Sequence, residues 1–157
     1  MEKSGVFNLV SGMYLLTTRE NDRDYGCLIN SAMEVSRAPG RIAVCLFKRN
    51  ATCEAVEKTG VFNLCAVTED APYDLFRRFG MTSSRKCDKF ADFPHMGRAE
   101  NGLVYLTRNT NMYLSATVTE SVDLGDHILL IGQITADQVL SDLPTCTFEH
   151  FSKDIRP

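Results

Sequence analysis

The fold class follows most directly from one stretch, Met112-Tyr-Leu-Ser-Ala-Thr-Val-Thr-Glu-Ser-Val122, which runs on into Asp123-Leu-Gly-Asp-His-Ile-Leu-Leu-Ile-Gly-Gln-Ile134. Its first half alternates polar and apolar residues, as a half-solvated antiparallel strand does. Asp123–Asp126 then supplies a turn, because glycine tolerates positive φ and aspartate hydrogen-bonds its own backbone. The apolar residues that follow predict a partner strand over Ile128–Val139. The stretch therefore predicts a long β-hairpin.

His127 follows the polar turn directly and opens the second strand of this hairpin. An imidazole at the mouth of a sheet or barrel is well placed to meet a ligand. The alternative is a strand-edge histidine that only hydrogen-bonds a neighbouring carbonyl. Spacing alone leaves both interpretations open, since a motif is a hypothesis until its structural context is known.

Outward from the hairpin, the chain alternates strand-like runs with turns and short helices. We expect strands over Met13–Arg19, Tyr25–Ser36, Arg41–Phe47 and Val61–Val67, and an edge strand over Thr145–Phe151. We expect helices before Gly12 and over Ala51–Thr59 and Pro72–Phe79, and a long loop over Met81–Gly102. Many strands with few helices predict a mainly β fold with α excursions, arranged as an antiparallel barrel. At 157 residues the chain fits one domain, residues 1–157.

Composition and charge exclude several classes of function. The net charge of −3 argues against nucleic acid as a partner, because nonspecific binding needs a basic surface. The six cysteines form no Cys-x-x-Cys pair, so we expect no metal site and free thiols in a reducing cytoplasm. The sequence has no secretory or transmembrane stretch, and we expect no membrane partner.

Small polar and basic residues gather where predicted strands end. Asn30-Ser31-Ala32-Met33 closes the second strand, and Lys48-Arg49-Asn50-Ala51-Thr52 follows the third and opens a helix. A helix N-terminus favours an anion, so the second group predicts a phosphate site. The alternative is an ordinary capped helix beside a solvated basic turn. Ser83-Ser84-Arg85 in the long loop is either a second phosphate contact or simply loop composition. Since the chain has neither G-x-G-x-x-G nor a Walker A sequence, a nucleotide would be held without those cradles.

Taken in order, several segments resemble the flavin reductase-like family. The matching segments are Gly12–Thr18, Gly26–Ser36, Arg41–Thr52, Thr59–Leu64, Phe76–Gly80, Asp88–Phe90 and the run that opens at Gly125. No single segment is specific, but the ordered set covers nearly the whole chain. The resemblance implies an FMN-binding split β-barrel of Greek-key type. It is strongest to the flavin reductase module that some anaerobe proteins join to a rubredoxin, although the rubredoxin Cys-x-x-Cys pairs are missing here.

The resemblance also implies a role for particular residues at a homodimer interface. Those expected beside the isoalloxazine ring are Asn30, Ser31, Ala32 and Met33, with Ser36 nearby. Those expected at the phosphate are Lys48, Asn50 and Thr52. The long loop is expected to add Lys89 and Phe90, with Ser83 or Ser84. His127 is expected to face the nicotinamide or the flavin edge as the catalytic residue.

Three functions remain open at this point. The first is an enzyme in which FMN accepts hydride from NADH or NADPH and passes electrons to free flavin or to a separate redox protein, rubredoxin-like or a flavoprotein. Hydride transfer requires stacked rings at about 3–3.5 Å rather than an acid–base dyad, which agrees with the absence of one. The second is a non-enzymatic FMN electron carrier. The third is a relative that binds another planar cofactor.

Overall fold

The computed structural model describes residues 4–157 and is built around a seven-stranded antiparallel sheet. In spatial order its strands are β2 (Arg23–Ile29), β1 (Tyr14–Glu20), β5 (Val61–Val67), β8 (Thr110–Asp123), β9 (His127–Val139), β4 (Gly40–Phe47) and β3 (Ala32–Arg37). The prediction of a mainly β, antiparallel fold is confirmed. The ladder is open among the described residues, with β2 and β3 as its edge strands, so a closed barrel is not formed by strand pairing.

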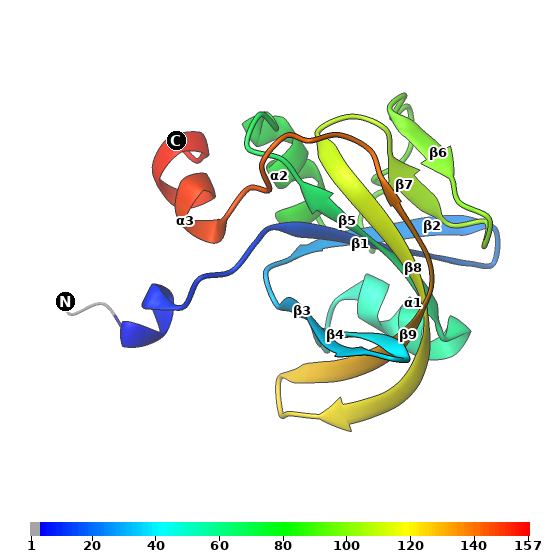
Figure 1. Cartoon of the computed structure of the whole chain (residues 1–157). Coiled ribbons are helices and arrows are strands. Elements are labelled where there is room, and N and C mark those ends of the chain that lie inside the picture. The colour runs from blue at the N-terminus through cyan, green and yellow to red at the C-terminus, as the bar shows by residue number, and fades with distance from the viewer. Residues whose placement is uncertain (1–3) are drawn as a thin grey trace.

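The two edge strands of the sheet are consecutive in the chain. Only Asn30 and Ser31 separate the end of β2 from the start of β3, so one end of each strand must lie at a common corner. Figure 1 shows the chain turning there from the upper half of the sheet to the lower half. The single predicted strand over Tyr25–Ser36 is therefore wrong, because two polar residues break it and send its halves to opposite edges.

The β-hairpin predicted over Met112–Val139 is confirmed. β8 and β9 pair from Met112 with Val139 to Asp123 with Ile128, and they are the longest strands of the fold. Gly125 in the connecting turn has φ of 108°, which a side chain would strain. Because β8 pairs with β5 and β9 with β4, this hairpin joins both halves of the sheet.

Short helices and turns complete the chain. They are η1 (Gly5–Asn8), α1 (Ala51–Thr59), α2 (Tyr73–Gly80), α3 (Phe148–His150) and η2, a π-helical turn over Phe151–Ile155. The helix predicted over Ala51–Thr59 is confirmed. Asn50 Oδ1 accepts the Thr52 N–H at 2.8 Å, and Gly60 ends the helix at φ of 72°. Both are the usual terminal residues of a helix.

Two parts of the chain differ from the prediction. The loop expected over Met81–Gly102 contains β6 (Met96–Arg98), which pairs with β7 (Val104–Leu106) as a separate small sheet. The edge strand expected over Thr145–Phe151 is wrong: Thr145 and Thr147 make single bridges, and the chain then coils into α3. Both segments lack the long alternation that makes a strand readable from sequence.

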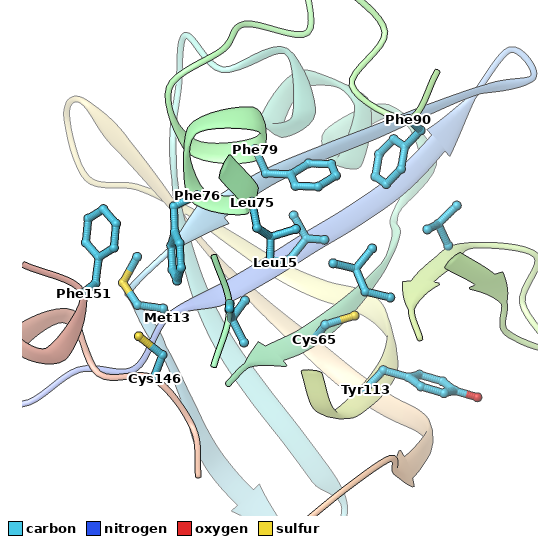
Figure 2. Packing of buried hydrophobic residues seen from close by; sticks show 14 of the residues in the cluster. Met13, Leu15, Cys65, Leu75, Phe76, Phe79, Phe90, Tyr113, Cys146 and Phe151 are labelled. Carbon is cyan, nitrogen blue, oxygen red and sulfur yellow. The ribbon is translucent and has the colours of Figure 1, made fainter. Parts of the chain in front are cut away.

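Buried apolar side chains form two clusters, one on each side of the sheet. The first lies under α2 and the C-terminal turn and contains Leu15, Phe76, Phe79, Phe90 and Phe151. Figure 2 shows Phe79 and Phe90 beside each other to the right of the green helix α2, with Phe76 closer to Phe151. The second cluster lies under α1 and between β4 and β9. All six cysteines are free thiols, in agreement with the prediction.

Candidate functional site

A cavity of about 300 Å³ opens at the corner where β2 and β3 meet. Four residues predicted to contact flavin line it together, namely Asn30, Ser31, Asn50 and His127. They come from the β2–β3 link, the N-cap of α1 and the start of β9. Apolar side chains form the opposite wall, among them Met13, Phe76, Met81, Phe148 and Phe151. A pocket of this size with a few convergent polar groups is the usual form of a small-molecule site.

His127 reaches the cavity because the sheet places it beside the end of β4. It pairs with Phe47 across the β4–β9 ladder, and the two rings meet edge to face with centroids 5.4 Å apart. Its Nδ1 lies 2.9 Å from Asp126 Oδ1. This bond lowers the pKa of the Asp126 carboxyl. Since an ionised carboxylate only accepts, Nδ1 donates in this bond, and in the tautomer that carries its single proton on Nδ1 the other nitrogen, Nε2, is an acceptor.

The other residues expected beside the ring divide into two groups. Asn30 and Ser31 lie at the corner and line the cavity, with Ser31 Oγ donating to Asn30 Oδ1 at 3.3 Å. Ala32, Met33 and Ser36 follow along β3 and do not line it. Met33 is 65% exposed, because alternate residues of an edge strand face opposite ways. The corner residues therefore line the cavity, and no residue of β3 does.

The N-terminus of α1 presents the residues expected at a phosphate. Asn50 caps the helix and lines the cavity. Thr52 is fully buried, and its Oγ1 has no hydrogen-bond partner among residues 4–157. Lys48 Nζ lies 2.6 Å from Asp123 Oδ2 on the β8–β9 hairpin, which lowers the pKa of that carboxyl. Thr52 does not line the cavity, so the helix end with Asn50 is the part of this group that faces it, while the lysine is already paired.

The long-loop residues lie outside the cavity. Lys89 is buried, and its Nζ donates to the carbonyls of Gly26 at 2.9 Å and Phe79 at 3.0 Å. Burial lowers the pKa of this ammonium group. Phe90 packs in the core against Phe79, as Figure 2 shows. The structure therefore does not bring Lys89 and Phe90 to the cavity, because the backbone carbonyls and the core already hold their side chains.

Ser83 and Ser84 do not line the cavity. Ser83 is exposed, and its Oγ accepts the Arg85 N–H at 3.1 Å. Ser84 is buried, and its Oγ has no hydrogen-bond partner in the described part of the chain. Ser84 lines a separate pocket beside Ala51 and Glu54 of α1 rather than the cavity itself.

Two thiols that the sequence did not single out also line the cavity. Burial raises the pKa of Cys27 to about 11 and raises the pKa of Cys45. Both are therefore neutral thiols near pH 7 and not thiolate nucleophiles. Among the residues that line the cavity, His127 is the remaining titratable side chain. The site suits binding and orientation of a planar group rather than acid–base or nucleophilic catalysis.

Sequence reasoning missed most of the apolar wall. Phe47 could have been found only from the β4–β9 register, which no local pattern reveals. Phe148 and Phe151 lie in the segment expected as an edge strand. Met81 follows α2 and was assigned to the loop. These residues come from separate parts of the chain, and only their packing makes them a wall.

A larger cavity of about 850 Å³ lies on the other side of α2. Charged residues such as Asp74, Arg77 and Arg108 line it, and of the predicted site residues only Lys89 does. Within residues 4–157, no group of three or more histidine, cysteine or acidic side chains is placed to hold a metal ion. No helix in the same range is both long and apolar enough to cross a membrane.

Comparison with known proteins agrees with this geometry. The model of the flavin reductase-like domain matches residues 6–153, which is nearly the whole chain. The chain belongs to the flavin reductase-like family. It is 31% identical over 151 residues to the high molecular weight rubredoxin of Moorella thermoacetica, with 96% of this chain and 66% of that protein covered. The chain thus spans just under two thirds of that relative.

A second relative is covered more fully. The ferric-chelate reductase (NAD(P)H) of Archaeoglobus fulgidus is 28% identical over 151 residues, with 96% of this chain and 89% of that protein covered. Solved structures show the same fold. An NADH:FAD oxidoreductase of Streptomyces globisporus matches with a TM-score of 0.82 at 18% identity, covering 91% of this chain and 84% of that one. An FMN-binding protein of Thermus thermophilus matches with a TM-score of 0.79 at 18% identity, covering 89% of this chain and 76% of that one. The predicted family is confirmed, and with it an oxidoreductase class and a flavin cofactor.

Proposed function

We propose that this flavin reductase-like protein is an FMN-dependent NAD(P)H oxidoreductase. It takes electrons from NADH or NADPH and passes them to free flavin or to a separate redox protein, rubredoxin-like or a flavoprotein. One observation carries the proposal most: residues from the β2–β3 corner, the N-cap of α1 and the start of β9 line one cavity with an apolar wall. The names of the relatives from Moorella and Archaeoglobus support a redox role and a nicotinamide donor.

The residues at the cavity fit the chemistry of FMN. Asn30 and Ser31 offer hydrogen bonds at the corner, while the apolar wall excludes water from one side of a planar ring. The N-terminus of α1, capped by Asn50 and preceded by Lys48, offers donors to a phosphate. FMN, when bound, supplies the hydride and electron chemistry that no side chain of the cavity supplies. The chain's part is to hold and orient the two rings.

His127 is proposed as the residue that orients the nicotinamide. Asp126 fixes its ring through Nδ1, and Phe47 supports one edge. Nε2 is then an acceptor at the rim of the cavity, which complements the N–H donors of a nicotinamide carboxamide. Correct orientation of the donor carbon toward the flavin contributes to the rate by reducing the entropy lost on reaction.

We also propose that residues 1–157 form one domain, with the sheet arranged as the split barrel of this family, and that two copies associate as a homodimer. Apolar side chains at the N-terminal end support the dimer, because Val6, Phe7, Leu9 and Val10 are all at least 66% exposed. Figure 1 shows this segment projecting away from the sheet. Large exposed apolar groups of this kind mark interaction surfaces. Light scattering that reports a flavin-loaded monomer at micromolar concentration would contradict the proposed dimer.

Rapid mixing of the FMN-loaded protein with NADH or NADPH, without oxygen, tests the enzymatic function. We expect the oxidised flavin absorbance to bleach within seconds with at least one nicotinamide. Dithionite serves as the control, because it reduces any bound flavin whatever the protein does. Bleaching by dithionite alone would favour the FMN electron carrier. A purified protein with no flavin absorbance and no affinity for added FMN would favour another planar cofactor.

A further inference from the structure

The larger cavity, of about 850 Å³, is separate from the site proposed for the flavin and the nicotinamide. Residues of α2, of the loop that follows it and of the β7–β8 turn line this cavity. Gly80 and Met81 line the flavin cavity and the next residue, Thr82, lines the larger one, so the two cavities adjoin at the end of α2. A cavity of this size is large enough for a small organic molecule.

The least exposed charged side chains of the larger cavity are both cations. Arg78 is half-buried and Lys89 is only 4% exposed, whereas the three lining carboxylates, Asp70, Asp74 and Asp88, are exposed. No carboxylate of residues 4–157 lies within salt-bridge distance of either cation, and backbone carbonyls accept their hydrogen bonds instead. The buried side of the cavity is therefore positively charged and lacks a counter-ion.

The exposed carboxylates of the cavity already have partners of their own. Asp74 pairs with Arg77 at 2.8 Å on the surface of α2. Asp88 accepts a backbone N–H at 2.9 Å, and Asp70 accepts the hydroxyl of Thr68. None of these bonds involves Arg78 or Lys89, so the carboxylates do not take the place of the missing counter-ion.

Arg78 is held in place and still has hydrogen-bond donors left for a ligand. Its Nε donates to the Lys89 carbonyl and its Nη2 to the Ala91 carbonyl, both at 2.6 Å. The guanidinium also lies over the ring of Phe93, 5.0 Å from the ring centroid. Nη1 has no partner among residues 4–157. An arginine that is fixed in this way, with one nitrogen free, is preorganised to bind an oxyanion.

Lys89 points to an anion independently of Arg78. Its Nζ donates to the carbonyls of Gly26 and Phe79, and an ammonium group has three donors, so one buried N–H has no partner in the described part of the chain. Burial of a charge without a counter-charge is costly, and it lowers the pKa of this ammonium group. A negative group on the buried side of the cavity would offset this cost.

A third cation, Arg108, lines the exposed side of the cavity. It belongs to the β7–β8 turn, and its side chain makes no hydrogen bond or ion pair within residues 4–157. Arg78 and Arg108 therefore reach the cavity from separate elements, and Leu75 and Phe93 add apolar surface. This arrangement suits a small molecule with a carbon skeleton and more than one oxyanion group.

We propose that the larger cavity is a second ligand site, which binds a small organic polyanion through Arg78 on its buried side and Arg108 on its exposed side. The ligand carries two or more carboxylate or phosphate groups, because both kinds of oxyanion accept from guanidinium groups. The inference goes beyond the proposed function, in which neither the flavin nor the nicotinamide occupies this cavity.

Calorimetric titration of the FMN-loaded protein with citrate and with fructose 1,6-bisphosphate tests the inference. FMN is kept at saturation so that neither probe enters the flavin cavity. We expect at least one probe to bind with a Kd below about 1 mM. Binding of citrate alone would identify carboxylates as the chemistry of the ligand, and binding of the bisphosphate alone would identify phosphates. If neither probe binds in this range, the inference is wrong.

Arg108→Ala and Arg41→Ala form a matched pair of variants. Both arginines are exposed and make no side-chain hydrogen bond or ion pair among residues 4–157, and only Arg108 lines the cavity. We expect Arg108→Ala to weaken the bound probe about fivefold, the upper value usual for an exposed pair of charges, and Arg41→Ala to change it less than about twofold. Equal weakening by the two variants would indicate general attraction to positive charge and would overturn the inference.

Arg78→Lys tests the buried side of the cavity. It keeps the positive charge but removes Nη1, and we expect it to weaken the probe at least about tenfold. Because Arg78 also holds the loop, thermal unfolding without probe is measured in parallel. A folded Arg78→Lys protein that binds the probe as tightly as the unchanged chain would contradict the inference. If this variant does not fold, the comparison of Arg108→Ala with Arg41→Ala decides.

Discussion

Replacing His127 by alanine is expected to slow reduction of the bound flavin by NAD(P)H while leaving the fold intact. The side chain is 41% exposed, and it makes one hydrogen bond, to Asp126, and one ring contact, to Phe47. Neither contact anchors the core, because Ile128 and Leu130 on the same strand carry the packing. The substitution is therefore expected to change the rate of flavin reduction without lowering the stability of the fold.

The magnitude follows from the bond that Nε2 would make. Losing one hydrogen bond in the transition state costs about 1–3 kcal/mol, which is a factor of about 5–150 in rate. Substitution of a surface side chain changes stability by about 0.5 kcal/mol or less. For a chain of this length that corresponds to a shift in Tm of about 2 °C or less. FMN affinity is expected to stay within about twofold, since the phosphate is held elsewhere.

The assay is anaerobic stopped-flow reduction of the FMN-loaded variant, with thermal unfolding measured in parallel. His95→Ala is the matched control, because this histidine is exposed and lines the larger cavity rather than the one that contains His127. Asp126→Asn is expected to slow reduction less than His127→Ala does, since the ring stays but loses its orienting carboxylate. An unchanged reduction rate together with a clearly lower Tm in His127→Ala would refute the reasoning and leave a purely structural histidine.

Three further predictions concern stability. Asn63→Ala should lower the unfolding free energy by at least about 2 kcal/mol in urea titrations, because its buried Oδ1 accepts from Ser115 Oγ at 2.7 Å and Asn101 Nδ2 at 2.9 Å. A change under about 0.5 kcal/mol, the size usual for a surface substitution, would contradict this. Burial alone would raise the pKa of the Asp24 carboxyl, but hydrogen bonds from Arg98 and Arg19 lower it. The stability that this carboxylate contributes is therefore present above pH 3.8 and lost as the pH falls further. Asp24→Asn should make the unfolding free energy fall less steeply as the pH is lowered from about 5 to about 2. Burial raises the pKa of Cys65 to about 12 from 9.0, so stability should fall as pH rises above 9 and Cys65→Ala should reduce that slope in urea titrations; an unchanged slope would exclude this thiol as the cause.

The sequence determined the parts of this protein that depend on neighbours along the chain. The β8–β9 hairpin follows from alternation and from Gly125 in its turn. The limits of α1 follow from Asn50 and Gly60, because a cap bonds within three residues and a left-handed end requires glycine. The ordered set of segments also sufficed for the family, which the match over residues 6–153 confirms.

Only the tertiary structure decided which distant residues share the site. Phe47 and His127 are far apart in sequence, and the β4–β9 register brings them together. Asn30 and Ser31 form a corner because β2 and β3 pair at opposite edges of one sheet, which no local pattern encodes. Lys89 turns inward because two backbone carbonyls need a donor there. Strand pairing and burial depend on contacts between residues that are distant in the sequence. The sequence therefore predicted many of the site residues but not their arrangement.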